Sequence, residues 1–289
     1  MQGQIITKRV HDWLKKYSRG EVEFPEHLVK QYILNVEKKI SKKRPEFRLR
    51  LSNLGRPTCQ LQSEKLELPK KPRNEYQRMY TFMVGDMSEQ WLILVMQAAG
   101  IELDYDIPVT LQIGGYIING TVDVIIDGKV YDIKTMSSKS FQMYTNFGGF
   151  KDVAEDDPFG YVEQLFAYSE ASGLPPGGWI IINKNTGEIA VTEMPINYEE
   201  YKAAALARML RTIGIITYTI EGISVEKLFG PEDEIFNKKP TGNKILSKTC
   251  SWCDFKDQCW PDVINRKSAV SSAKIKPYVD YLEVNYEKE

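Results

Sequence analysis

Four cysteines are the residues of this chain whose spacing most directly suggests chemistry. Cys250, Cys253 and Cys259 lie within one ten-residue stretch, and Cys59 lies almost 200 residues upstream. Two cysteines separated by two residues can present both sulfurs to one metal ion or cluster, and a third soon after them supplies another ligand. The pattern therefore predicts a four-thiolate centre in which Cys59 fastens a distant segment to the C-terminal part of the chain.

Disulfide bonds are the weaker interpretation of these cysteines. The segment from Met1 to Val10 contains no apolar run of the length that export requires. Disulfides persist mainly in exported proteins, whereas metal-bound thiols are typical of a reducing compartment. We therefore expect a cytoplasmic protein.

Two carboxylates and a lysine form a second candidate site, in a β-rich part of the chain. Asp123 ends the sequence Gly-Thr-Val-Asp, and Asp132 and Lys134 belong to the sequence Tyr-Asp-Ile-Lys. The intervening dipeptide Asp127-Gly128 predicts a two-residue hairpin, which places the two carboxylates on adjacent strands. Because side chains alternate along a strand, Asp132 and Lys134 share one face.

Carboxylates are poor sheet formers, so their presence in apolar strands favours a role as ligands of a hard divalent cation. Mg²⁺ or Mn²⁺ fits oxygen ligands, whereas Zn²⁺ prefers nitrogen or sulfur. The cation would neutralise charge that develops on a phosphodiester, and the lysine could orient or help to deprotonate the attacking water. The alternative is an exposed strand face that carries an ordinary Asp-Lys pair.

Periodicity and turn signals predict an α/β chain around these groups. The long central helix should bury Met79 and Phe82, and a Gly- and Asp-rich loop should follow the lysine strand. We expect helices over residues 10–40 (two helices), 74–99, 159–172 and 198–218, strands over 107–113, 116–126, 129–134, 179–183 and 188–194, and a loop over 137–158.

The composition excludes several functional classes. The chain has 289 residues, 42% of them hydrophobic, and a formal net charge of −1, so a polyanion site must come from local basic patterns. The stretch from Lys38 to Arg50 is the most basic, although such stretches are more often solvated helix ends. No apolar run approaches the roughly 20 residues of a membrane span. The chain also lacks a phosphate-binding loop, and His11 and His27 have no catalytic partner motif.

The order of the carboxylate motifs resembles the core of the PD-(D/E)XK nuclease superfamily, specifically its RecB-like exonuclease branch. That branch has a helix before the meander with histidine or an acidic residue four positions after a glycine, and Glu89 follows Gly85 at this spacing. It also has a Gln-x-x-x-Tyr motif on the helix after the lysine strand, which Gln164 and Tyr168 match on one helical face. The resemblance covers roughly residues 50–262. It implies a restriction-endonuclease-like core, with a mixed sheet and an antiparallel meander flanked by helices.

This resemblance implies a role for each motif residue. Lys134 would position the attacking water, and Gln164 and Tyr168 would hold the substrate backbone near the metal. Glu89 stands where many members of the branch carry histidine. Four groups would bind the catalytic Mg²⁺ or Mn²⁺ through oxygen: Glu89, Asp123, Asp132 and the backbone carbonyl of Ile133.

The cysteine spacing resembles that of the iron-sulfur members of the branch, the AddB-like nucleases and the CRISPR-associated RecB-like nuclease. These place one cysteine before the nuclease core and three after it, which implies a structural 4Fe-4S cluster held by Cys59, Cys250, Cys253 and Cys259. A four-cysteine zinc site is the competing interpretation. The implied segments are an N-terminal helical region (1–74), the nuclease core (75–220), an iron-sulfur segment (221–264) and a charged, frayed tail (265–289).

The resemblance further implies a DNA exonuclease that prefers single-stranded ends and works with repair, phage recombination or CRISPR adaptation proteins. Phosphate contacts are expected from Arg56, Arg73 and Arg78. A group of aromatic residues in the 137–158 loop would either stack on unpaired bases or fill the core: Phe141, Tyr144, Phe147 and Phe150.

Two other functions compete with this one. The first is a DNA-binding or assembly module that keeps the fold without turnover, and the intact Asp123, Asp132 and Lys134 argue against it. The second is a zinc-stapled structural protein whose acidic pair faces solvent. The sequence indicates neither the polarity of digestion nor the oligomeric state.

Overall fold

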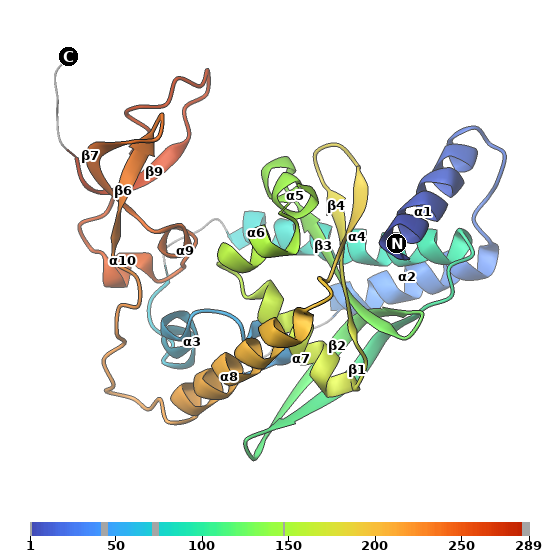
Figure 1. The fold of residues 1–289 in the computed structure, drawn as a ribbon, viewed down its shortest axis with the longest axis horizontal. Helices are drawn as coiled ribbons and strands as arrows, with labels where there is room; N and C mark the ends of the chain where they lie inside the picture. The colour runs from blue at the N-terminus through green and yellow to red at the C-terminus, as the bar shows by residue number, and fades with distance from the viewer. Residues whose placement is uncertain (1, 42–45, 71–74, 147, 285–289) are drawn as a thin grey trace. The chain divides into compact units, whose positions relative to one another are not determined.

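A mixed five-stranded β-sheet forms the centre of the fold, in agreement with the predicted α/β class. The computed structural model describes residues 2–41, 46–70, 75–146 and 148–284 (Figure 1). The sheet has the order β1-β2-β3-β4-β5, in which β3 and β4 are parallel and the other neighbours antiparallel. The strands are β1 (Asp104–Ile113), β2 (Tyr116–Ile126), β3 (Lys129–Met136), β4 (Pro176–Asn183) and β5 (Ile189–Glu193).

The predicted antiparallel meander is confirmed in β1, β2 and β3. Asp127 and Gly128 both have positive φ, 48° and 70°, as the two central residues of a type I′ hairpin turn require. The parallel strand β4 is buried at every position, because helices cover both faces of the sheet there.

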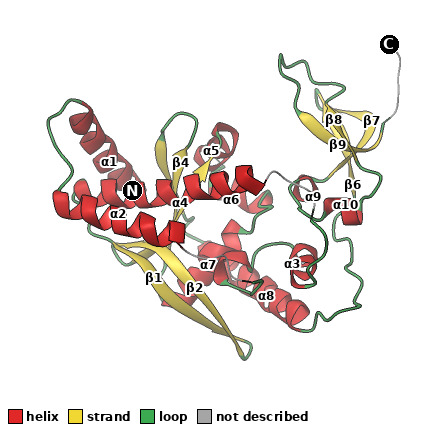
Figure 2. Ribbon diagram, turned by 180° about the vertical axis from the view of Figure 1, so that it is seen from behind, coloured by secondary structure: helices red, strands yellow, loops and turns green. Residues whose placement is uncertain are grey.

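Helices α1 (Gln2–Ser18) and α4 (Glu75–Ala98) lie on one face of the sheet, and α2 (Glu26–Ser41) packs against α4 (Figure 2). Their core joins Trp13, Leu92 and Val95 to Ile133 and Ile180. The predicted burial of Met79 and Phe82 is wrong, because they are 58% and 49% exposed. In α4 only the residues from Trp91 onward pack in the apolar core under the sheet, so the first turns keep an apolar exposed face.

Helices α5 (Ser138–Thr145), α6 (Phe150–Glu155), α7 (Tyr161–Ser172) and α8 (Tyr198–Thr217) supply the core of the other face, together with the short 3-10 helix η1 (Leu51–Asn53). The predicted loop over 137–158 is therefore wrong. Ser137 caps α5 by accepting a hydrogen bond from Ser140 N, and apolar side chains of α5 and α6 enter the core. None of the helices in the described part of the chain combines the length and apolar character that a membrane span needs.

The second sheet has four antiparallel strands in the order β6-β7-β9-β8. The expected frayed tail after Asn265 is wrong, because β8 and β9 pair there and Tyr281 is fully buried. Short helices accompany this sheet. The elements are α3 (Thr58–Lys65), β6 (Pro231–Phe236), β7 (Lys239–Leu246), α9 (Lys248–Ser251), α10 (Lys256–Cys259), β8 (Ile264–Lys267) and β9 (Tyr278–Glu283).

The chain forms two compact units. The first comprises Met1–Gly55 and Arg73–Ile213 and contains the five-stranded sheet. The second comprises Arg56–Pro72 and Gly214–Glu289 and contains the four-stranded sheet. These bounds differ from the four predicted segments, since α1 and α2 pack with the first sheet whereas α3 groups with the C-terminal strands.

A buried carboxylate anchors the second unit. Glu234 of β6 accepts hydrogen bonds from Tyr281 Oη at 2.6 Å, from Asn243 Nδ2 at 2.6 Å and from Thr241 Oγ1 at 3.0 Å. Burial raises the pKa of Glu234, but these three donors outweigh it, so the pKa lies below its usual value. The ionised group therefore stabilises the unit above the unfolded pKa, and that contribution is lost as the pH falls through the folded pKa.

Substitution of Glu234 by glutamine should destabilise this unit. We expect Glu234→Gln to lower the free energy of unfolding at neutral pH by about 1.5–3 kcal/mol, because hydrogen bonds to a charged group are lost. Denaturant titration of the full chain measures this loss, which should shrink in acid as the wild-type carboxylate protonates. Glu232→Gln, at an exposed position of the same strand, is the control, and equal midpoints for the two variants would contradict the prediction.

Candidate catalytic and cysteine sites

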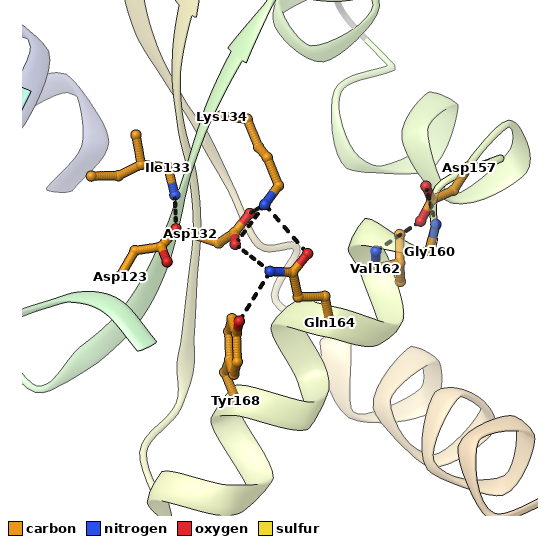
Figure 3. Close-up of polar contacts among 9 residues, drawn as sticks. All are labelled: Asp123, Asp132, Ile133, Lys134, Asp157, Gly160, Val162, Gln164 and Tyr168. Carbon is orange, nitrogen blue, oxygen red and sulfur yellow. Dashed lines mark hydrogen bonds and ion pairs between the residues drawn. The ribbon is translucent and has the colours of Figure 1, made fainter. Parts of the chain in front are cut away.

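The candidate catalytic site lies where β2 and β3 separate. The last paired residues of the two strands are Val124 and Tyr131, and Asp123 and Asp132 occupy the next positions. Asp123 Oδ2 accepts a hydrogen bond from Ile133 N at 2.8 Å (Figure 3). The carboxylate thus replaces the ladder partner that the Ile133 amide would have in a continuous sheet.

Asp132 is fully buried on the face of β3 that α7 covers. Lys134 Nζ lies 2.8 Å from both carboxylate oxygens, with hydrogen-bond geometry to Oδ1. Gln164 Nε2 also donates to Oδ1, at 2.9 Å. Oδ2 accepts no well-aligned hydrogen bond from the described residues and is balanced by the charge of Lys134 alone. A cation could therefore take the place of that ammonium at this oxygen.

Gln164 and Tyr168 lie on one face of α7, as their spacing predicts. Gln164 Nε2 donates to Tyr168 Oη at 3.1 Å, and Gln164 Oε1 accepts from Lys134 Nζ at 3.3 Å (Figure 3). Both side chains are buried. Their contacts are therefore with the acidic group and with each other, which favours a role in fixing Asp132 and Lys134.

The start of α7 is held by Asp157, a residue that the sequence analysis did not single out. Its carboxylate accepts from Gly160 N at 2.9 Å and from Val162 N at 2.8 Å (Figure 3), as a cap of a helix N-terminus does. Gly160 has φ of 74°, and a Cβ there would lie 2.1 Å from the Gly55 backbone. The cap and this close approach set the position of Gln164.

Glu89 lies on α4 and is 15% exposed. Its Oε1 is 2.9 Å from Lys39 Nζ of α2, and the same ammonium lies 3.3 Å from Asp106 Oδ1 of β1. Sequence reasoning missed Lys39 and Asp106, because one lies in a general basic stretch and the other in a strand without a motif. Tyr161 was also missed, and its ring lies 4.7 Å from Lys134 Nζ.

Negative charge is poorly stabilised at this site. Burial, followed by the charge of Asp123, raises the pKa of Glu89 to about 7, against the effect of Lys39. Burial, followed by Asp132, raises the pKa of Asp123 to about 7, and burial raises the pKa of Asp132. Burial therefore disfavours the charged form of all three carboxylates, and additional positive charge nearby would favour it.

The charged forms of Lys134 and Lys39 are favoured, in contrast to those of the carboxylates. Burial lowers the pKa of Lys134 and of Lys39, but the neighbouring carboxylates outweigh it, so both pKa values lie above the usual range. Both side chains therefore carry charge at neutral pH and donate hydrogen bonds.

The donor set fits a hard divalent cation in its chemistry. Carboxylate oxygens with raised pKa values, among them Asp132 Oδ2, which accepts no well-aligned hydrogen bond from the described residues, are suited to Mg²⁺ or Mn²⁺. Among the described residues, no three His, Cys, Asp or Glu side chains already converge enough to hold one metal ion together. Binding would therefore require the carboxylates to exchange their lysine contacts for the cation.

The four cysteines gather around one pocket of the second unit, although no three of them already converge enough to hold one metal ion together. One pocket is lined by Cys59 of α3, Cys250 of α9, Cys259 of α10 and Cys253 of the segment between α9 and α10, together with Trp260. All four are free thiols. Ser247 caps α9 by accepting from Cys250 N at 3.2 Å, and Phe255 N donates to Cys253 Sγ at 3.4 Å. The long-range grouping predicted for Cys59 is thereby observed.

The surroundings of Cys59 and Cys253 favour the protonated thiol over the thiolate. Burial, followed by the neighbouring thiols, raises the pKa of Cys59 to about 11, and burial, opposed by the Phe255 amide, raises the pKa of Cys253 to about 11. Clustered thiols whose thiolates repel one another gain strongly when a metal or cluster supplies positive charge. The set therefore fits either an iron-sulfur cluster or zinc.

Other predicted residues are not at the site surface. Phe141, Tyr144 and Phe150 are buried and pack in the core of the first sheet, with Tyr144 and Phe150 against Trp179. The core-filling alternative is thus confirmed for these three. Arg56 is ion-paired with Glu64 at 2.9 Å. Phe147, Arg73, the Arg78 side chain and the basic residues Lys42, Lys43 and Arg44 lie outside the described residues.

Comparison with known proteins gives little further guidance. No family model and no curated protein matches the chain. Among solved structures, "Crystal structure of SSO0001" matches with a TM-score of 0.41 and 16% sequence identity, over 81% of this chain and 95% of that chain. A likeness at this level identifies neither a shared fold nor a shared function.

The cysteine pocket should bind metal in the purified protein. We expect anaerobically prepared wild-type protein to be brown and to contain iron in excess of zinc, and Cys253→Ser to lose that metal because a buried ligand is removed. Elemental analysis and absorbance spectra measure both. Ser251→Ala, two residues away, is the control. Colourless protein with stoichiometric zinc would overturn the iron expectation, and metal-free protein would overturn both.

Proposed function

We propose that this chain is a metal-dependent DNA exonuclease of the PD-(D/E)XK superfamily, in its RecB-like branch, with a restriction-endonuclease-like core. The observation that carries the proposal is the arrangement of Asp123, Asp132 and Lys134 at the separation of β2 and β3, with Gln164 on the adjacent helix. A site without a catalytic role has no need to place a buried and a half-buried carboxylate beside a lysine.

The cation would be held by Glu89, Asp123, Asp132 and the Ile133 carbonyl. Once bound, it would neutralise charge that develops on the phosphodiester during hydrolysis. The chain's own residues prepare the position of each ligand. The Ile133 amide orients Asp123, and Gln164 orients Asp132 while it is itself fixed by Tyr168.

Lys134 would act as a charged hydrogen-bond donor toward the attacking water. Its ammonium is held by Asp132 and Gln164, packs over the Tyr161 ring and keeps its proton at neutral pH. Three protons on the ammonium allow one to remain directed to the reacting oxygen while the others bind the protein. Orientation of the water, and not removal of its proton, is the role that this geometry favours.

The cysteines would hold a 4Fe-4S cluster with a structural role. The cluster would join α3 to α9 and α10, segments almost 200 residues apart in the chain. A link that closes so long a loop restricts the unfolded chain strongly. Neither redox chemistry nor a direct part in hydrolysis is required of it.

Single-stranded DNA ends remain the proposed substrate. The surface proposed to stack on their bases differs from the aromatic residues of 137–158 that the sequence suggested. The aromatic residues of α5 and α6 are buried, whereas Tyr76 and Tyr80 of α4 are 66% and 63% exposed. The two tyrosines lie one turn apart on the helix that carries Glu89. Along the helix axis, Tyr80 lies about 14 Å from Glu89. Exposed aromatic faces in a row suit the stacking of unpaired bases.

Cleavage of end-labelled DNA tests the proposed activity. We expect Lys134→Ala to lower the rate on single-stranded DNA by about 100-fold or more, because the group that orients the water is lost, and EDTA to abolish cleavage. Lys129→Ala, on the same strand, should cleave like wild type. The prediction fails if Lys134→Ala retains activity, and wild-type protein that cleaves no DNA with Mg²⁺ or Mn²⁺ would point to the binding module.

The stacking surface is tested by affinity. We expect Tyr76→Ala combined with Tyr80→Ala to weaken binding of single-stranded DNA by about 10-fold or more, since each stacked base contributes about 1–3 kcal/mol. Affinity for blunt duplex DNA should change little. Tyr278→Ala, an equally exposed tyrosine on β9, is the control in fluorescence anisotropy titrations. Equal losses for single-stranded and duplex DNA would contradict the stacking role.

A further inference from the structure

Lys39 has no part in the hydrolysis described above, yet its ammonium lies within the candidate site. It belongs to the last turn of α2 and contacts Glu89 Oε1 at 2.9 Å and Asp106 Oδ1 at 3.3 Å. Its side chain is only 26% exposed. Surface lysines ordinarily extend their charge into water, so this inward ammonium is held by the two carboxylates.

Asp106 occupies an unusual place in the sheet. Its neighbours Tyr105 and Ile107 pair with Val124 and Val122, so Asp106 lies opposite Asp123 in the register. Its φ is 52°, a conformation that non-glycine residues rarely adopt inside a strand. The ion pair with Lys39 is the contact that its side chain makes there, and it places a second acceptor beside Glu89.

Lys39 and a divalent cation would compete for the same carboxylate. Glu89 Oε1 already accepts from the ammonium, and a cation on Glu89 would lie within a few ångströms of that positive charge. Like charges at such a separation repel strongly in a partly buried site. Asp106 offers the displaced ammonium an anionic partner that it already touches.

We propose that Lys39 is a positioning residue of the metal site, a built-in counter-cation for Glu89. It neutralises the buried carboxylate in metal-free protein and shifts fully onto Asp106 when a divalent cation binds Glu89. The inference rests on the proposed function, because it takes Glu89 as a ligand. It makes α2, through one side chain, a determinant of the affinity for metal.

The test is direct Mn²⁺ binding by the full-length protein, measured from the electron paramagnetic resonance signal of free Mn²⁺. We expect Lys39→Met to bind Mn²⁺ about tenfold more tightly than wild type, a difference of about 1.4 kcal/mol. Lys38→Met removes the same charge from the preceding, exposed position of α2 and should bind like wild type.

The role of Asp106 is tested by a double-mutant cycle. Asp106→Asn should weaken Mn²⁺ binding in the wild-type background, because Lys39 then has Glu89 as its remaining acidic partner. In the Lys39→Met background the same substitution should have much less effect. Equal effects in both backgrounds would show that Asp106 acts through space and not through Lys39, and would overturn this part of the inference.

Lys39→Met could also lose stability, because the partly buried Glu89 then loses its ion pair and keeps the weaker hydrogen bond from Gln90 Nε2 at 3.1 Å. Thermal unfolding with and without Mn²⁺ keeps the test decisive, since the rise in Tm on adding Mn²⁺ should be larger for Lys39→Met than for Lys38→Met. If Lys39→Met and Lys38→Met both bind Mn²⁺ with wild-type affinity and Asp123→Ala abolishes Mn²⁺ binding, the Lys39 inference fails and the proposed function stands. If neither wild type nor variants bind Mn²⁺, both fail.

Discussion

The separation of β2 from β3 beyond the Val124–Tyr131 pair is the constraint on which the candidate catalytic site depends. Where the ladder stops, the Ile133 amide needs an acceptor, and Asp123 supplies it. One residue earlier on β3, Asp132 lies on the face that α7 covers and accepts a hydrogen bond from Gln164. A continuous hairpin at this point would have paired the backbone groups with each other and left no reason for either carboxylate.

The charge concentrated at that separation shapes the surrounding elements. Lys134 and Gln164 stabilise Asp132 from the side of α7, and Lys39 stabilises Glu89 from the side of α2 and α4. Buried carboxylates without such partners would protonate or unfold the local structure. Positive charge in the protein thus supplies part of what a divalent cation would supply, and the affinity for the proposed cation would depend on how readily the lysines move.

The second unit follows a related principle with different chemistry. Glu234 receives three hydrogen bonds and its charge is well stabilised, so it contributes to stability without a ligand. Among the thiols, burial and the neighbouring thiols raise the pKa values of Cys59 and Cys253, so their charged forms are disfavoured. The contrast between the Glu234 carboxylate and the thiols is the reason for proposing a metal in this unit only at the cysteines.

The sequence by itself determined the α/β class, the meander with its Asp127-Gly128 turn, and the pairs Asp132 with Lys134 and Gln164 with Tyr168, because these follow from local periodicity and turn chemistry. The expectation that the two pairs act together came from the order of the motifs, which resembles that of a known family. The sequence also indicated that Cys59 joins three distant cysteines, since thiols of that spacing share few other uses. Tertiary structure alone decided that Tyr144 and Phe150 are core, that residues after Asn265 form strands, and that Lys39 and Asp106 join the site. These depend on which surfaces meet across the chain, and no local pattern encodes the contact of one helix end with a strand 67 residues away.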